Sequence, residues 1–128
     1  MSHLQRILYV EDDADILAIG QLALEQVAGF EVCACESGAQ ALAAAADFKP
    51  QIMLLDVMLP DMDGLAILAA LRRLPETADS LAIFMTAKLH ADDRQVYREA
   101  GVENVIAKPF DPMTLGDEIR AIWDKSPD

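Results

Sequence analysis

Short apolar runs alternate along the chain with longer segments in which apolar residues recur at helical spacing. Five runs have the length and composition of strands, and they cover residues 6–10, 30–35, 51–56, 81–86 and 104–107. A helix is expected after each strand, over residues 14–28, 38–46, 64–74, 92–101 and 112–123. Strands joined through a short helical connection pair in parallel, so the pattern predicts a doubly wound α/β fold whose parallel sheet is covered on both faces.

Several of the predicted helices carry residue types that favour a start or a stop. Ser37 stands three residues before Gln40, which is the capping-box spacing at the start of the second helix. Gly29 is expected to end the first helix. Asp111 as the N-cap and Pro112 at the first helical position predict where the last helix begins.

The spacing of apolar residues in the first helix predicts which of its sides faces the core. The predicted core side carries Ile16, Ile19, Gly20, Ala23 and Val27. Leu17 and Leu24 lie beyond that stripe, so they are interpreted as available for contacts beyond core packing.

The length of the chain suits one domain with a full hydrophobic core, and we expect residues 1–128 to form a single unit whose core spans about residues 5–124. The sequence contains no run of eighteen apolar residues, so a membrane-spanning helix is not expected. The opening segment MSHLQR lacks the pattern of a secretory signal, and a cytoplasmic location is therefore expected.

The charge of the chain is strongly negative, with 22 acidic against 10 basic residues and a formal net charge of −12. Nucleic acid phosphates are bound by Lys and Arg, so the composition argues against direct nucleic-acid binding and favours a cation or a basic protein surface. Cys33 and Cys35 are expected on one face of a strand, without good geometry for a mutual disulfide. No Cys or His cluster completes a metal site with them, so both are interpreted as small buried apolar residues.

The polar residues of greatest chemical interest follow the predicted strands. The first strand leads into EDDAD, the third ends at Asp56, the fourth at Thr86 and Ala87, and the fifth at Lys108. Ligands of doubly wound sheets bind outside the carboxyl ends of the strands, so these residues should meet at one edge. A loop so rich in carboxylates repels phosphate groups but suits a hard cation, and Mg²⁺ takes both carboxylate and phosphate oxygens.

Asp56 occupies an unusual position, because four apolar residues precede it in what looks like a fully buried strand. Such a strand fixes the direction of the single carboxylate at its end. A metal ion, the Lys108 ammonium and the Thr86 hydroxyl around that carboxylate would stabilise the charge on a phosphoryl group in transfer. The residues therefore predict that Asp56 accepts a phosphoryl group.

The same residues carry a resemblance to a known family. ILYVEDDADI resembles the acidic opening motif of response-regulator receiver domains, LLDVMLPDMDG the phosphoacceptor motif, FMTA the hydroxyl segment and AKPF the lysine motif. With four motifs in this order, the chain is similar to a receiver domain over essentially its whole length. The resemblance implies a flavodoxin-like sheet of strand order 2-1-3-4-5 with five helices. It also implies a signalling switch of a two-component phosphorelay that assists only its own phosphorylation and dephosphorylation.

The resemblance further implies a partner and a metal ion. Asp56 would take the phosphoryl group from the phosphohistidine of a histidine kinase or of a histidine phosphotransfer protein. Asp12 would bind Mg²⁺ directly and Glu11 through water, and the backbone carbonyl of Met58 would be a further ligand.

The remaining site residues follow from the fourth and fifth strands. By resemblance, Thr86 and Lys108 would contact the phosphoryl oxygens, Ala87 would leave room for the donor, and the Lys108–Pro109 peptide bond would be cis. The chain departs from the family at Val105, where an aromatic switch residue is often found. A conformational signal is therefore expected to travel through the helix over about residues 90–100.

A docking surface for the phosphoryl donor is expected beside the start of the first helix, where family resemblance places the partner's phosphohistidine. The expected patch consists of Ala14, Ile16, Ile19, Pro109 and Phe110.

Three other functions remain open at this stage. A Mg²⁺-dependent aspartyl-phosphate phosphatase or phosphotransferase would share the acceptor chemistry, but such enzymes generally need a second carboxylate two residues later, where this chain has Met58. A flavin-binding electron carrier on the same fold is disfavoured by the acidic first loop and by an aromatic content of 5%. A receiver-like scaffold that takes no phosphate is disfavoured because every site residue is present.

Overall fold

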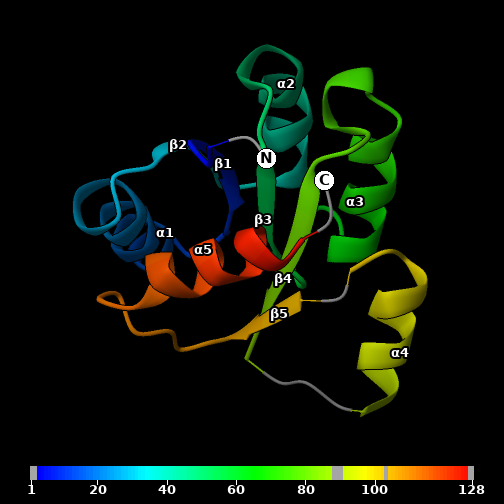
Figure 1. Ribbon diagram of the computed structural model, residues 1–128. Helices are drawn as coiled ribbons and strands as arrows, with labels where there is room; N and C mark the ends of the chain where they lie inside the picture. The colour runs from blue at the N-terminus through cyan, green and yellow to red at the C-terminus, as the bar shows by residue number, and fades with distance from the viewer. Residues whose placement is uncertain (1–2, 88–90, 103, 127–128) are drawn as a thin grey trace.

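The computed structural model describes residues 3–87, 91–102 and 104–126, and its centre is a sheet of five parallel strands (Figure 1). The strands are β1 (Arg6–Val10), β2 (Glu31–Cys35), β3 (Ile52–Asp56), β4 (Leu81–Thr86) and β5 (Asn104–Ala107). Their order is β2-β1-β3-β4-β5. The doubly wound fold and the strand order expected from the sequence are both confirmed.

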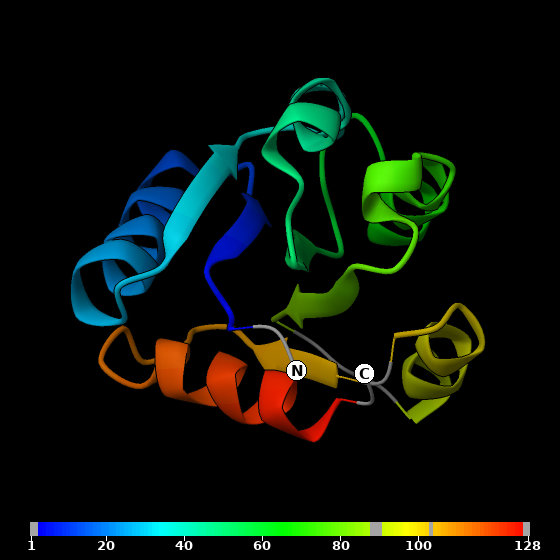
Figure 2. The same cartoon turned by 45° about the horizontal axis from the view of Figure 1, so that its top comes forward.

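Helices cover both faces of this sheet. They are α1 (Ala14–Leu22), continued by the π-helical segment η1 (Ala23–Val27), then α2 (Gly38–Phe48), α3 (Gly64–Arg72), the short 3₁₀ segment η2 (Pro75–Thr77), α4 (Ala91–Glu99) and α5 (Leu115–Lys125). Figures 1 and 2 show α1 and α5 on one face and α2, α3 and α4 on the other. Within the described part of the chain, no helix has the length and apolar character needed to cross a membrane.

The alternation of side chains along the strands divides the core into two clusters. Ile7 and Tyr9 point into the cluster under α1 and α5, whereas Leu8 and Val10 point into the cluster under α2, α3 and α4. All five residues of β3 are buried, because this central strand is covered on both faces. The carboxylate of Asp56 is therefore carried on the most enclosed strand of the sheet.

The starts of three helices follow from side-chain caps. The Asp13 carboxylate accepts hydrogen bonds from the N–H groups of Asp15 and Ile16, and the Asp63 carboxylate caps α3 in the same manner. The Ser37 hydroxyl accepts from the N–H of Gln40, as the capping-box spacing predicts. The Gln40 side chain reaches back to the N–H of residue 36 instead of to that of the cap residue.

The predicted start of the last helix is wrong by three residues. Asp111 was expected to cap it with Pro112 at its first position, but α5 begins at Leu115. The Asp111 side chain accepts the N–H of Met113, and its backbone carbonyl accepts the N–H groups of residues 114 and 115. Asp111 therefore caps a turn that precedes the helix. All other predicted boundaries lie within two residues of those observed, and most coincide with them.

The predicted core side of the first helix is only partly correct. Gly20 and Ala23 are buried as expected, but Ile19 and Val27 are 49% and 48% exposed. Leu17 and Leu24, which were placed outside the core stripe, are the buried residues. The physical reason for the shift at Val27 is η1, where the N–H of residue 28 bonds to the carbonyl of Ala23 and the wider turn changes the phase of the helix.

Close packing of Gly20 against Tyr9 fixes how α1 sits on the sheet. A Cβ atom at position 20 would lie 2.4 Å from the Tyr9 hydroxyl oxygen and 2.6–2.7 Å from its ring carbons. The Tyr9 side chain is fully buried on β1 and has little room to withdraw. Only a residue without a side chain therefore allows this helix to approach the strand.

Replacing Gly20 by Ala should lower the free energy of unfolding by about 1–3 kcal/mol through overpacking, although Ala is the better helix former by about 1 kcal/mol. Chemical denaturation measures the change. Ala18→Gly, at an exposed position of the same helix, isolates the propensity effect in the opposite direction. A Gly20→Ala protein more stable than the parent would contradict the packing argument.

Candidate functional site

The predicted site residues come together in one cavity at the carboxyl edge of the sheet. The cavity has a volume of about 730 Å³. Its lining includes every residue proposed from the sequence, namely Glu11, Asp12, Asp56, Met58, Thr86, Ala87 and Lys108. The fold therefore assembles the set from four separate strands, as the rule for doubly wound sheets predicts.

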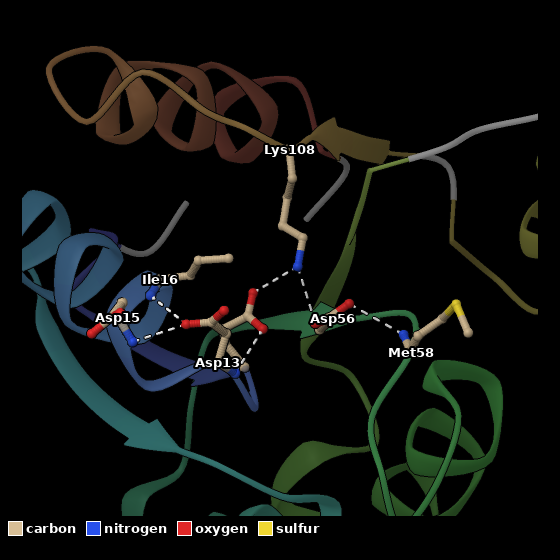
Figure 3. Close-up of polar contacts among 7 residues, drawn as sticks. Asp13, Asp15, Ile16, Asp56, Met58 and Lys108 are labelled. Carbon is tan, nitrogen blue, oxygen red and sulfur yellow. Dashed lines mark hydrogen bonds and ion pairs between the residues drawn. The ribbon is translucent and has the colours of Figure 1, made fainter.

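Lys108 joins the two buried carboxylates of the site. Its Nζ lies 2.8 Å from Glu11 Oε1 and 3.1 Å from Asp56 Oδ2, and Figure 3 shows the ammonium reaching from β5 toward β3. The side chains of Glu11 and Asp56 are only 1% and 7% exposed. Two carboxylates so close and so enclosed repel each other, and the ammonium between them offsets that repulsion.

The ionisation of these groups reflects burial and this bridge. Burial raises the pKa of Glu11 to about 7, while the hydrogen bond from Lys108 lowers it and the neighbouring Asp56 raises it again. Burial alone would lower the pKa of Lys108, but its hydrogen bonds to the two carboxylates outweigh burial and raise that pKa. The Lys108 ammonium thus stays charged, whereas the pKa of Glu11 lies near neutral pH.

Three carboxylates at this edge are placed to share a cation. One oxygen each from Glu11, Asp12 and Asp56 lies within 4.8 Å of the others, and Asp12 is exposed to solvent. Oxygen donors of this kind suit Mg²⁺, which keeps several waters and so tolerates ligands that do not close a full cage. The donor chemistry of the site therefore fits the metal expected from the sequence.

The loop between β3 and α3 is held in place by hydrogen bonds between backbone N–H groups and carboxylates and by one β-bridge. The Met58 N–H donates to Asp56 Oδ1 at 3.2 Å, which directs one oxygen of the acceptor, and residues 58 and 63 form a β-bridge. The two oxygens of Asp61 accept the N–H groups of residues 38 and 39 at 3.1 Å, which ties the loop to the start of α2. The backbone of Met58 is thus fixed beside Asp56, while its side chain is 79% exposed.

The loop after β5 has the expected peptide geometry. The Lys108–Pro109 bond is cis, as the resemblance implied. The N–H of Lys108 donates to the carbonyl of Thr86 at 2.9 Å, so the ends of β4 and β5 are joined directly beside the site.

Sequence reasoning missed Tyr97 and Asp93 of α4 as members of the cavity lining. Tyr97 is 6% exposed and belongs to the cavity wall. The signal available in the sequence was one aromatic residue in a mostly polar helix, because such a residue marks the side of the helix that packs against the rest of the domain.

Comparison with known proteins gives one family for this arrangement. The model of the response regulator receiver domain matches residues 7–120. PrrA of Mycobacterium tuberculosis, a transcriptional regulatory protein, is 34% identical over 117 residues, which cover 91% of this chain and 49% of PrrA. PhoB of Pseudomonas aeruginosa, the phosphate regulon transcriptional regulatory protein, is 38% identical over 116 residues, covering 91% of this chain and 50% of PhoB. The chain thus spans about half the length of these relatives.

Solved structures agree with the sequence relatives. The chemotaxis response regulator CheY4 of Vibrio cholerae superposes with a TM-score of 0.85 and 25% identity, covering 94% of this chain and 99% of CheY4. The structural similarity therefore extends over nearly the whole of this chain.

Removing the ammonium should expose how strongly it holds the site together. In metal-free buffer, Lys108→Met should lower the free energy of unfolding by about 3 kcal/mol, because two enclosed carboxylates then lack a cation. The difference between variant and parent should grow as the pH rises above about 7. Burial already raises the folded-state pKa of Glu11 to about 7 in the parent, so both proteins lose this stability below pH 7; the pKa of Glu11 rises further without Lys108, so only the variant goes on losing stability above pH 7.

Urea denaturation at several pH values measures this effect. The control is Lys125→Met, which removes an exposed lysine from the end of α5. Equal, pH-independent losses in the two variants would contradict the bridging role.

Proposed function

Because this chain belongs to the response regulator receiver domain family, we propose that it is a phosphorylation-dependent switch whose Asp56 takes a phosphoryl group from a partner's phosphohistidine. Receiver domains are signalling switches of two-component systems rather than metabolic enzymes. The observation that carries the proposal is the Asp56 carboxylate, held at the end of a buried strand beside the Lys108 ammonium and two further carboxylates.

Transfer to Asp56 is an exchange of one bond for another. A carboxylate oxygen of Asp56 forms a bond to phosphorus as the bond between phosphorus and the imidazole nitrogen breaks. The electron pair of that broken bond stays on the imidazole, which takes up a proton. The products are an aspartyl phosphate and a neutral histidine, so no oxidant, reductant or further reactant is needed.

The surrounding side chains then have distinct tasks. Lys108 already donates to Asp56 and reaches a phosphoryl oxygen by a short movement of its ammonium. The Thr86 hydroxyl, at the end of the neighbouring strand β4, donates to another phosphoryl oxygen. Ala87 follows with a small side chain that leaves the approach to Asp56 open.

Mg²⁺ would be held by Asp12 and Asp56 directly, by Glu11 through water and by the Met58 carbonyl, and it would neutralise phosphoryl oxygen charge during transfer. The closeness of the three carboxylates supports this assignment. The fixed backbone of Met58 supports its carbonyl as the further ligand.

The partner is proposed to be a histidine kinase or a histidine phosphotransfer protein that docks beside the cavity. A groove of about 120 Å³ runs between α1 and the loop after β5, and its lining is largely apolar. It is formed by Ile16, Ile19, Lys108, Pro109 and Phe110. Ile16 lines both the groove and the main cavity, so a helix seated in the groove would bring its histidine to Asp56.

Two observations favour this function over its alternatives. The residue two positions after Asp56 is Met58, whose exposed apolar side chain offers no acid or base for a phosphatase. The acidic lining of the cavity repels the phosphate of a flavin.

The net charge of −12 supports an output through protein contacts, although the names of the relatives describe transcriptional regulators of about twice this length.

Incubation with acetyl phosphate and Mg²⁺ should add about 80 Da to the protein, the mass of one phosphoryl group on a carboxylate. Intact-mass spectrometry measures the adduct, which should vanish in Asp56→Asn and on chelation of Mg²⁺. Asp79→Asn, at an exposed position far along the chain, is the matched control and should still be labelled. An unmodified parent protein that nevertheless binds Mg²⁺ would favour the scaffold function.

Replacing Ile16 by Arg should slow transfer from a phosphorylated histidine kinase at least about tenfold, because a buried apolar contact of the groove is lost and a charge is placed there. Labelling by acetyl phosphate should change little. The control is Leu22→Arg, which alters an exposed leucine on the same helix outside the groove. Equal loss with both phosphodonors would refute a docking role for Ile16.

A further inference from the structure

Helix α4 is attached to the protein chiefly through one side chain. Among the described side chains of this helix, over residues 92–99, Tyr97 alone is buried, with 6% of its surface exposed. Val96 is 46% exposed and the remaining residues are polar. The helix also lies at the edge of the molecule, beyond α3 (Figure 1). The position of α4 therefore depends on where the Tyr97 ring is held.

The Tyr97 ring is held by Phe84 of β4. The two rings pack edge to face, with their centroids 4.9 Å apart and an interplanar angle of 85°. Phe84 is fully buried, so it offers Tyr97 a rigid surface. Burial first, and then the charges of Asp93 and Asp63, raise the pKa of the Tyr97 hydroxyl.

The same side of β4 carries the hydroxyl of the site. Thr86 is two residues after Phe84, so both side chains leave the same face of the sheet. Thr86 and Tyr97 both line the cavity that contains Asp56. A movement of Thr86 toward a group on Asp56 thus changes the wall to which Tyr97 belongs.

Val105 completes this arrangement from the neighbouring strand. It pairs in register with Phe84 and lies half-buried against the same apolar cluster as Tyr97. The Val105 side chain is smaller than an aromatic ring, so it leaves part of Phe84 uncovered on this side. The Tyr97 ring of α4 packs against Phe84 there. The aromatic ring beside the site therefore belongs to a helix instead of to β5.

We propose that Tyr97 is the positioning residue through which the phosphoryl state of Asp56 sets the position of α4. The inference rests on the proposed function and adds a route for its signal. A phosphoryl group on Asp56 shifts α4 between two positions only if it interacts differently with the Tyr97 ring in each of them. Tyr97 lines the same cavity as Asp56, so the ring meets a group on Asp56 differently when it moves. Because the described side chains of α4 include a single buried ring, displacing the helix breaks few of the packing contacts that the structure describes, so a small bias at the site is enough to move it.

Amide hydrogen exchange of α4 tests the proposal. The protein is compared without ligand and with Mg²⁺ and beryllofluoride, a stable analogue of the phosphoryl group. In the parent protein, exchange of the α4 amides should change by at least about threefold between the two states. Tyr97→Phe, which keeps the ring, should retain most of that change. Tyr97→Leu, which keeps apolar bulk without the ring, should lose it, whereas Val96→Leu should behave like the parent.

Fluorine NMR gives a second measurement that does not depend on the stability of a variant. The chain has two tyrosines, so 3-fluorotyrosine labelling yields two resonances, and Tyr97→Phe identifies them. The Tyr97 resonance should move to a new position with beryllofluoride and Mg²⁺. Unchanged α4 exchange together with an unmoved Tyr97 resonance would overturn the proposal, as would a Tyr97→Leu protein that responds like the parent.

The mass of the acetyl phosphate product separates this inference from the function on which it rests. The parent protein should gain the Mg²⁺-dependent phosphoryl group whether or not α4 responds, because the transfer uses Asp56 and Lys108. A labelled parent protein whose α4 does not respond would refute the role of Tyr97 alone. A parent protein that takes neither acetyl phosphate nor beryllofluoride would refute the switch function itself.

Discussion

One ion-paired contact determines what the carboxyl edge of this sheet is able to do. Lys108 donates to Glu11 and to Asp56 although it lies 97 and 52 positions from them in the sequence, so only the completed fold creates the bridge. Without it, two enclosed carboxylates would repel each other and one would hold a proton. With the bridge, Asp56 Oδ2 accepts a hydrogen bond from the Lys108 ammonium. An arriving metal ion and phosphoryl group would then replace one set of opposite charges by another.

The rest of the fold is organised to keep that edge in place. Asp56 cannot withdraw, because every residue of its strand is buried. The loop after β3 is tied to α2 by Asp61, and the end of β5 is bonded to the end of β4. Such fixed geometry would favour the proposed transfer to one oxygen of Asp56, since the carboxylate, the ammonium and the carbonyl of Met58 would need no large rearrangement before reaction.

The sequence was sufficient to predict the sheet and the set of residues that meet at its carboxyl edge, because each of these residues follows a strand and the ends of parallel strands meet by topology. It was not sufficient where packing between distant elements decides. The orientation of α1 depends on Gly20 meeting Tyr9 and on the π-helical turn of η1, and neither follows from apolar spacing. Asp111 and Pro112 have the residue types of a helix start, yet their turn closes before α5 begins. The position of Tyr97 in the cavity wall required the contact with Phe84.

The two surfaces proposed for signalling lie on opposite faces of the sheet. Phe110 of the docking groove packs against the cluster under α1 and α5, whereas Tyr97 belongs to the cluster under α2, α3 and α4. A donor seated on α1 would therefore not obstruct a displacement of α4. Since the buried strands between them are tightly packed, the cavity around Asp56 is the place where both surfaces meet. Under the proposed function, the occupancy of that cavity is therefore what the incoming partner and the responding helix share, with Asp56 between them.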